Sequence, residues 1–499
     1  MTTTEYYQTY KERMQQVADV KHAAAVLQWD QETYLPPKGA ANRGRQLASL
    51  SEIAHKLFTE EKLGEILNEL SARNDLAADE KRNVELTLED YNRNKKYSSE
   101  FVRKLTEQIN RSFHSWIEAR RKNSFAFFEN DLSQLIELKK QEADLLGYEK
   151  HPYNALVDEF EKGCTVDFLD HVFSGLLPQL KDLFDKVKQK PQVDASFLQQ
   201  EFPKQQQWEW GMWLIKQMHF DFDAGRQDIS EHPFTTSFGN TDVRVTTRIN
   251  EQDFSSMTWS CIHELGHALY EQGLPQDQYG LPLGEAASLG IHESQSRLWE
   301  NNVGRSLAFW EYFFPVVQQK FPAQLSNISV VEFYRSINKT ESSLIRTEAD
   351  ELTYHFHVII RYELEKKLIE GSIQSSDIPA FWNEQYEKYL GVKSTDDLKG
   401  CLQDVHWSHG SFGYFPTYTL GSLYAAQFFQ VIRQSVPNLD DKLKQGNSNE
   451  ILDWLRKNVH IHGRKYTSKQ LCERITGKSL DSSALVNYLF DKYRLIYNL

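Results

Sequence analysis

Apolar residues recur at every third or fourth position along most of the chain, a spacing that lines one face of an α-helix for burial. The segment 41–72 shows this well, because Leu47, Leu50 and Ile53 fall on one stripe. The segments with this period are 5–30, 41–72, 77–147, 150–222, 341–371, 377–391 and 422–499. The pattern therefore predicts a mainly α-helical protein.

Three short stretches depart from this period or mark its limits. Residues 232–249 are rich in threonine, valine and phenylalanine around a central Gly-Asn pair, which is typical of a β-hairpin. Ser329 followed by Glu332 predicts a capping box for a helix that begins near 330. The glycine- and aromatic-rich stretch 400–421 predicts a loop that enters a helix. We expect the hairpin to border the helix that carries the motif described next.

The run HELGH at 263–267 is the most informative chemical pattern in the sequence. On a helix, His263 and His267 lie one turn apart on one face. Two such imidazoles and one oxygen ligand make a tetrahedral zinc site with one position open for water. Glu264 then lies beside the open position as the natural general base. The motif predicts a catalytic zinc site.

A third ligand must come from elsewhere in the chain. The glycine and third histidine of the metzincin pattern do not follow His267, so a downstream carboxylate on another helix is expected. Glu285, Glu293 and Glu300 all lie within the stretch LGEAASLGIHESQSRLWENN. Their spacing from the histidines does not choose among the three.

Composition limits the class of protein. The 499 residues are 40% hydrophobic and carry a net charge of −13, which argues against nucleic acid or an anionic membrane as a partner. The polar N-terminal stretch lacks the apolar core of a signal peptide, and no apolar run is long enough to cross a bilayer. The four cysteines show no CxxC spacing, which suits a reducing compartment. We therefore expect a cytoplasmic protein.

Domain organisation is expected to be simple, since no tandem repeat or low-complexity linker divides the chain. We predict one domain over 1–499. Within it, the charged helices of 1–150 form a lid or scaffold, 220–425 carries the motifs as the catalytic core, and 426–499 adds C-terminal helices.

Six short motifs follow one another in order around the predicted metal helix. They are HPF at 232–234, DVRVT at 242–246, HELGH at 263–267, HESQ at 292–295, IRTEAD at 345–350 and GCLQDVHW at 400–407. Together they resemble the carboxypeptidase Taq family of zinc carboxypeptidases. The match spans about 175 residues directly, and the chain length and helical character fit the family throughout.

The resemblance implies a fold and an activity. The fold is similar to angiotensin-converting enzyme and neurolysin, with a deep substrate groove between two helical halves and N-terminal helices that partly cover it. The implied activity is removal of single residues from peptide C-termini, with broad side-chain specificity, by a homodimer with one divalent metal per subunit. The family's HES/GQ motif implies Glu293 as the third ligand.

A carboxypeptidase must recognise a free terminal carboxylate, and an arginine fork suits that group because it makes two charge-assisted bonds. Arg346 in IRTEAD is the first candidate and Arg244 in DVRVT the second; the family's motifs imply the same residues.

Further roles fall on the stretch HGSFGYFPTY, which is similar to the loop of neurolysin-type enzymes that closes over substrate. Tyr418 and His409 are expected to stabilise the oxyanion of the tetrahedral intermediate, a role worth about 3 kcal/mol per donor in other enzymes, and Tyr414 is expected to contact substrate. His232 and His406, together with the neighbouring Asp404 and Trp407, either line the closed end of the groove or form a buried hydrogen-bond network. These residues complete the set of site candidates.

Two alternatives stay open. A zinc oligopeptidase or dipeptidyl carboxypeptidase would use the same metal chemistry, and a non-catalytic peptide-binding protein would hold a structural zinc. Structural sites are usually closed by four protein ligands, so the three ligands and Glu264 favour catalysis. Cobalt or manganese can replace zinc at two histidines and a carboxylate.

Overall fold

Helices provide nearly all the regular structure in the computed structural model, which describes residues 1–499. The mainly α-helical fold predicted from the hydrophobic period is therefore confirmed. The chain separates into two compact units, each built from three discontinuous segments. Unit 1 comprises Met1–Lys95, Asp194–Ile337 and Phe428–Ser479, and unit 2 comprises Lys96–Val193, Asn338–Gln427 and Leu480–Leu499. The subdivision into 1–150, 220–425 and 426–499 stays a prediction.

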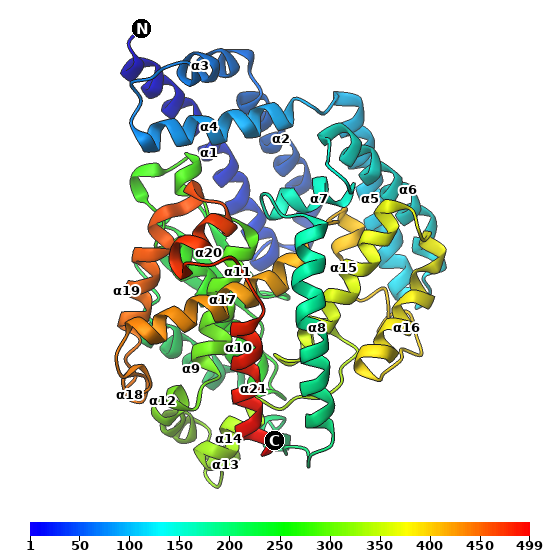
Figure 1. The fold of residues 1–499 in the computed structure, drawn as a ribbon, viewed down its shortest axis with the longest axis vertical. Coiled ribbons are helices and arrows are strands. Elements are labelled where there is room, and N and C mark those ends of the chain that lie inside the picture. Colours follow the sequence, from blue (N-terminus) through cyan, green and yellow to red (C-terminus); the bar gives the residue numbers. More distant parts are fainter. The chain divides into compact units, whose positions relative to one another are not determined.

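Unit 1 contains the predicted metal helix. Its helices before the sheet are α1 (Thr3–Thr33), α2 (Ala40–Phe58), α3 (Glu61–Ser71), α4 (Ala78–Asn94) and α9 (Lys204–Gln217). After the sheet come α10 (Phe254–Glu271), α11 (Leu289–Arg297), α12 (Leu307–Lys320), α13 (Pro322–Leu325), α14 (Val330–Ile337), α18 (Leu439–Leu443), α19 (Asn449–Asn458) and α20 (Ser468–Thr476). The helices α1 and α2 lie side by side as a hairpin (Figure 1). The capping box predicted at Ser329 is present at the start of α14, where Ser329 and Glu332 each accept the other's backbone N–H.

The small sheet of unit 1 has three strands, β1 (Gly225–Ile229), β2 (Thr235–Ser237) and β3 (Val243–Thr247), in the order β1-β3-β2. The antiparallel pair β2 and β3 confirms the predicted hairpin. Strand β1 pairs parallel to β3 and was not predicted, because GRQDI is short and polar and lacks the alternation that marks a strand. Both β2 and β3 pack against α10, so the hairpin borders the metal helix as expected.

Unit 2 is helical throughout its regular structure. Its helices are α5 (Ser99–Lys122), α6 (Ala126–Leu146), α7 (Tyr153–Phe160), α8 (Val166–Lys188), α15 (Tyr354–Glu370), α16 (Ile378–Leu390) and α21 (Ser483–Tyr497). The helices α5 and α6 lie side by side (Figure 1). A further helix, α17 (Pro416–Ser435), begins in unit 2 and continues past Gln427 into unit 1.

The helix predicted over 341–371 is wrong in its first part. Residues 341–353 form a loop with one 3₁₀ turn, and α15 begins only at Tyr354. The cause is Asp350, whose carboxylate accepts the backbone N–H groups of Leu352 and Thr353 at 2.9 and 3.0 Å. Side-chain acceptors of this kind compete with the helix for backbone donors. The loop instead contacts α21.

Two contacts hold this loop on α21. The backbone N–H of Thr340 donates to the hydroxyl of Tyr497 at 3.0 Å. The ammonium of Lys492 pairs with the carboxylate of Glu351 at 2.6 Å, and both side chains are buried. The path of residues 340–351 therefore depends on a helix that follows them by more than a hundred residues.

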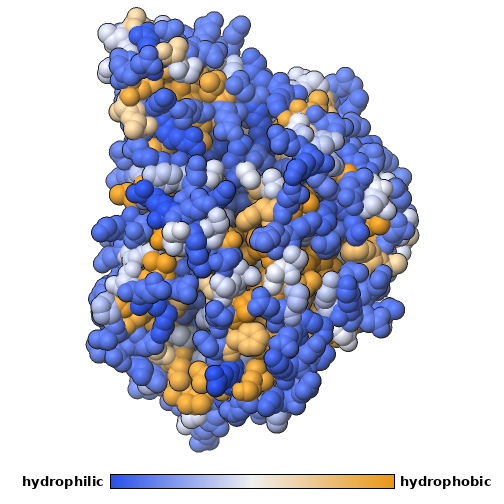
Figure 2. All heavy atoms as spheres, viewed as in Figure 1, coloured by the Kyte–Doolittle hydropathy of each residue, from blue (hydrophilic) through white to orange (hydrophobic).

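Aromatic side chains form the core around the metal helix α10. Trp210 of α9 packs near Trp310 of α12, and Phe254 at the start of α10 packs edge-on against Phe321 and Phe333. The visible surface is mostly hydrophilic (Figure 2), as expected from a mean hydropathy of −0.60. None of the helices is both long and apolar enough to span a lipid bilayer.

Candidate active site

The helix α10 carries the HELGH residues, and both of its ends are well defined. The carboxylate of Asp253 accepts the backbone N–H of Ser255 at 2.8 Å and so caps the first turn. The helix ends at Glu271, just before Gly273. His263 and His267 therefore lie on adjacent turns of a regular helix, with ring centroids 5.1 Å apart.

Gly266, inside the motif, allows α10 and α11 to approach closely. A Cβ added at this position would lie 2.5 Å from the Cα of Ser296 and 2.7 Å from the carbonyl oxygen of Gln295. Both of those atoms belong to the backbone of α11, which also carries Glu293. The absence of a side chain at Gly266 thus brings the third candidate ligand toward the two histidines.

We expect Gly266→Ala to destabilise unit 1 by about 1–3 kcal/mol, because the new methyl group meets backbone that cannot turn aside. The same variant should bind a divalent metal more weakly, since α11 must shift. Gly44→Ala is a matched control, because a Cβ there meets nothing within 4 Å and alanine suits a helix better than glycine. The urea midpoint and the metal dissociation constant measure both effects. Equal midpoints for the two variants would contradict this account.

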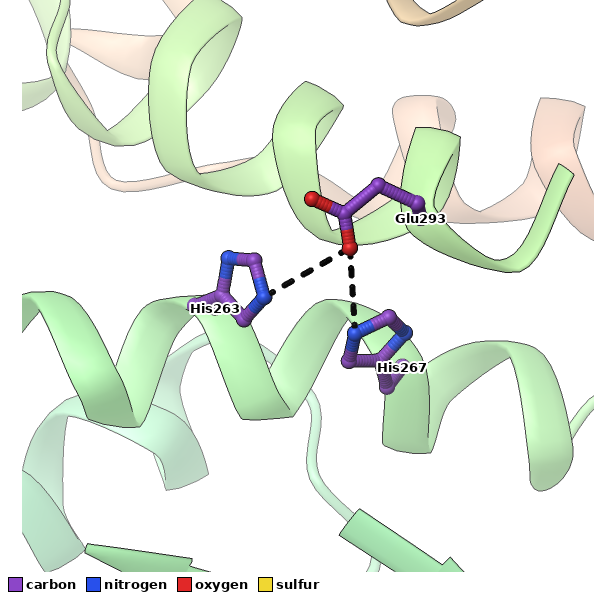
Figure 3. Close-up of side chains that lie close together, drawn as sticks. All are labelled: His263, His267 and Glu293. Atoms are coloured by element: carbon purple, nitrogen blue, oxygen red, sulfur yellow. Dashed lines mark ion pairs between the residues drawn. The ribbon is translucent and has the colours of Figure 1, made fainter. Parts of the chain in front are cut away.

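Three side chains converge on one point between α10 and α11 (Figure 3). The Nε2 atoms of His263 and His267 lie 3.7 and 3.6 Å from Oε2 of Glu293. Two imidazole nitrogens and one carboxylate oxygen form the donor set of many catalytic zinc sites. Two donors about 2 Å from a tetrahedral ion lie roughly 3.3 Å apart, so the cluster fits a divalent cation.

The other two carboxylates weighed from the sequence lie elsewhere. Oε2 of Glu300 is 2.9 Å from Nδ1 of His263, on the opposite side of the ring from Glu293. Glu285 instead pairs with Arg464 at 3.4 Å. Of the three candidates, Glu293 alone joins the convergent group.

Glu300 supports His263 from a π-helix, η5 (Leu298–Gly304), that continues α11. Its carboxylate also contacts Arg297 at 3.4 Å and Arg305 at 3.2 Å. Burial would raise the pKa of Glu300, but the hydrogen bond with His263 and the two guanidinium groups outweigh it, and the pKa is lowered. Glu300 is therefore an ionised acceptor that orients the His263 ring.

The two histidines have opposite electrostatic surroundings. Burial would lower the pKa of His263, but the carboxylates of Glu293 and Glu300 outweigh it and raise the pKa to about 9. The pKa of His267 is lowered well below its usual value, chiefly by burial. The surplus of negative charge near His263 favours a bound cation.

Glu264 is held by the sheet. Its Oε2 accepts a hydrogen bond from the hydroxyl of Thr235 in β2 at 2.6 Å, and the side chain is buried. Burial raises the pKa of Glu264, which moves a carboxylate toward the range useful for a general base.

In unit 2, Arg346 belongs to a buried charge cluster. Its Nε and Nη2 lie 3.0 and 2.9 Å from Oδ1 of Asp404, and its Nη1 donates to the hydroxyl of Tyr354 at 3.2 Å. The other oxygen of Asp404 accepts from Nε of Arg361 at 2.6 Å. Burial would raise the pKa of Asp404, but Arg361 and Arg346 outweigh it and lower the pKa.

The aromatic loop that precedes α17 lies beside this cluster within unit 2. The hydroxyl of Tyr418 is 3.3 Å from Nε2 of His406, and the guanidinium of Arg346 lies 5.0 Å from the Tyr418 ring centroid. Tyr414 packs edge-on against Tyr418 at 5.3 Å. His409 packs instead on Phe113 of α5 at 4.9 Å. These contacts group Tyr418, in the first turn of α17, with His406 and Tyr414, whereas the ring of His409 packs on Phe113.

A buried carboxylate holds this loop. Glu365 accepts hydrogen bonds from the Trp407 indole at 2.8 Å, the Tyr153 hydroxyl at 2.7 Å and the Gly413 backbone at 2.9 Å. Burial raises its pKa to about 7. Trp407 and Asp404 therefore belong to buried networks, which is the second of the two interpretations that the sequence left open for them.

The remaining predicted residues are in unit 1. Arg244 on β3 makes two 2.9 Å bonds to Asp242 and lies 4.4 Å from the ring centroid of Trp29. His232 is exposed just before β2, where its carbonyl oxygen accepts from the Ser230 hydroxyl at 2.6 Å. Their roles in binding substrate stay predictions.

Four supporting residues were not identified from the sequence. His292 and Glu271 contact the His267 side of the cluster, Thr235 contacts Glu264, and Arg361 contacts Asp404. His292 lies inside the HESQ motif, which was a usable signal. No local pattern marks the other three.

Comparison with known proteins agrees with this geometry. A family model for "Carboxypeptidase Taq (M32) metallopeptidase" matches residues 9–493. Carboxypeptidase 1 of Bacillus subtilis (strain 168) is 39% identical over 496 residues, covering 99% of each chain. The solved structure of CHT has a TM-score of 0.97 at 56% identity, over 98% of this chain and 99% of that one. The M32 carboxypeptidase from Deinococcus radiodurans R1 also has a TM-score of 0.97, at 38% identity over 99% and 100%.

These matches extend over almost the full length of both compared chains, and they confirm the resemblance drawn from the six motifs. The protein is an enzyme, a divalent-metal-dependent carboxypeptidase that hydrolyses peptide bonds. The chain belongs to the carboxypeptidase Taq (M32) family of metallopeptidases.

Proposed function

We propose that the metal is zinc, bound by His263, His267 and Glu293, and that the enzyme releases single amino acids from peptide C-termini with Glu264 as general base. The observation that carries the proposal is the convergence of two imidazole nitrogens on one carboxylate oxygen, at 3.7 and 3.6 Å. A zinc ion bound there supplies Lewis-acid chemistry that lowers the pKa of a water molecule and polarises the scissile carbonyl.

Glu264 moves the proton. Its Oε1 accepts a proton from the attacking water, while the Thr235 hydroxyl holds Oε2 at 2.6 Å and fixes the direction of the carboxylate. The same oxygen then donates that proton to the nitrogen of the leaving amino acid. The raised pKa of the buried carboxyl supports both halves of this cycle, because the group must accept and then release one proton near neutral pH.

Arg346 is proposed to bind the terminal carboxylate of the substrate. Asp404 and Tyr354 engage its Nε, one N–H of Nη2 and one of Nη1. One N–H on each terminal nitrogen remains, and that pair matches a carboxylate bidentately. Asp404 holds the guanidinium in place, and Arg361 in turn holds Asp404.

The other predicted residues complete the proposal. Tyr418 and His409 are proposed to donate to the oxyanion, and Tyr414, His406, His232 and Arg244 to contact the peptide. Burial lowers the pKa of His406 to about 4. With its single proton on Nε2, the neutral ring can donate to the Tyr418 hydroxyl oxygen, 3.3 Å away, which leaves the phenolic hydrogen for the oxyanion. A cytoplasmic location and a homodimer are proposed from the composition and from the family resemblance described above.

We expect a mixed unblocked peptide to yield a ladder that loses one residue at a time from its C-terminus. A chelator should stop the ladder and added zinc should restore it, while the same peptide with a C-terminal amide should be cut far more slowly. Mass spectrometry of the products measures all three results. Internal fragments or released dipeptides would support an oligopeptidase or dipeptidyl carboxypeptidase instead, and the absence of cleavage with any divalent metal would support a peptide-binding protein.

A further inference from the structure

The Nδ1 atoms of the two proposed histidine ligands have different hydrogen-bond partners. Nδ1 of His263 faces the carboxylate of Glu300 directly, at 2.9 Å. Nδ1 of His267 instead faces Nδ1 of a third histidine, His292, at 2.5 Å. The other ring nitrogen of His292 lies 2.8 Å from Oε1 of Glu271. Two groups, His292 and then Glu271, therefore follow His267 in one hydrogen-bonded series.

We propose that His292 and Glu271 are positioning residues that set which nitrogen of His267 is available to the metal. This inference rests on the proposed metal site. Neither residue is a ligand in it, and both act only through His267.

The direction of each hydrogen bond follows from Glu271, the last group of this hydrogen-bonded series. A carboxylate has no proton to donate, so Glu271 accepts from Nε2 of His292. A ring with its one proton on Nε2 has an acceptor at Nδ1. His267 must donate to it from Nδ1. Its Nε2 is left with a lone pair, on the side that faces Glu293 at 3.6 Å.

The contacts also argue against His292 as a ligand. Both of its ring nitrogens are engaged, one by His267 and the other by Glu271. Its neighbour in sequence, Glu293, joins the convergent donor group, and His292 does not. Successive residues on a helix point about 100° apart, so His292 and Glu293 can serve the same metal in different ways, the first through His267 and the second by direct contact.

The donor and acceptor pattern of His267, His292 and Glu271 suggests a conservative variant. A glutamine side chain has one accepting oxygen and one donating nitrogen, and a neutral imidazole has one accepting and one donating nitrogen. His292→Gln can therefore accept from His267 and donate to Glu271. His292→Leu fills similar space and can do neither, so the two variants separate hydrogen bonding from packing.

The test is the zinc dissociation constant, measured by competition with a chromophoric chelator. We expect His292→Leu and Glu271→Leu to weaken zinc binding by about 10- to 100-fold, the usual effect of losing a group that orients a ligand. His292→Gln should recover most of the loss seen in His292→Leu. The double variant Glu271→Leu/His292→Leu should bind no more weakly than His292→Leu alone, because one broken hydrogen bond already disables the series.

Two controls keep the test decisive. His219→Asn changes a histidine of unit 1 whose Nε2 lies 3.0 Å from the Ser448 hydroxyl, and it should leave zinc affinity unchanged. The absorption spectrum of the cobalt-loaded His292→Gln variant should match that of the wild type. Melting of each variant in excess chelator shows whether it folds, and if His292→Leu does not, Glu271→Leu and His292→Gln decide the result.

Zinc affinity within about threefold of wild type in His292→Leu or Glu271→Leu would overturn the proposal. So would an altered cobalt spectrum in His292→Gln, because that outcome would make His292 a ligand. These measurements need no substrate. Failure of the proposed function would appear as wild-type enzyme that binds zinc and releases no C-terminal residue, whatever the His292 variants do.

Discussion

Glu264→Gln is expected to bind zinc within about threefold of the wild-type affinity and to lose peptide hydrolysis by about 10²- to 10⁴-fold, the range for removal of a general acid–base group. Glutamine keeps the shape of the side chain and can still accept from the Thr235 hydroxyl, which lies 2.6 Å from Oε2. It cannot take a proton from water at neutral pH. Steady-state kcat on an unblocked peptide and the zinc dissociation constant measure the two effects.

Thr235→Val is the control for this variant. It removes one hydrogen bond to Glu264 and leaves the carboxylate, so a loss of about 1 kcal/mol, or roughly fivefold in rate, is expected. If Glu264→Gln retained more than a tenth of wild-type kcat, another group would have to serve as the base. If it lost zinc as well as activity, the defect would lie in the metal site.

Arg346→Met is expected to lower kcat/KM for peptides with a free C-terminus by roughly 30- to 5,000-fold, which corresponds to the 2–5 kcal/mol that truncating one side of a desolvated charge pair costs. Methionine has a similar length and no charge. Asp404 would keep its partner Arg361, at 2.6 Å between Nε and Oδ2, so no unpaired charge is left buried and the fold should survive.

The matched control for this variant lies in the substrate. A peptide with a C-terminal amide lacks the carboxylate, so wild type and Arg346→Met should cut it at similar rates. The preference for free acid over amide should be large in the wild type and close to one in the variant. An unchanged preference in Arg346→Met would remove Arg346 from substrate recognition and direct attention to Arg244.

The metal helix was predictable because its evidence is local. HELGH lies within one helix, and the Ser329 capping box and the β2–β3 hairpin are equally short-range. Spacing alone left three carboxylates open as the third ligand; the family motif implied Glu293, and the structure brings that residue to the two histidines.

The supporting groups were not predictable in the same way. Glu300 reaches His263 across 37 residues, and Arg361 reaches Asp404 across 43. Such contacts depend on how helices pack, and periodicity carries no information about them. The wrong helix over 341–353 has a related cause, since Asp350 captures backbone donors that a helical pattern assigns to the helix itself.

The loop that carries Arg346 is fixed by a helix made much later. Thr340 and Tyr497 are 157 residues apart, yet one hydrogen bond joins them. At about 5–20 residues per second, a ribosome needs roughly 8–30 s to cover that distance. During that interval the loop has no α21 to rest on, and unit 2 lacks its third segment. A growing chain therefore acquires its proposed carboxylate-binding arginine in working position only after residues 480–499 have been made, so peptide trimming by this enzyme should begin after synthesis and not during it.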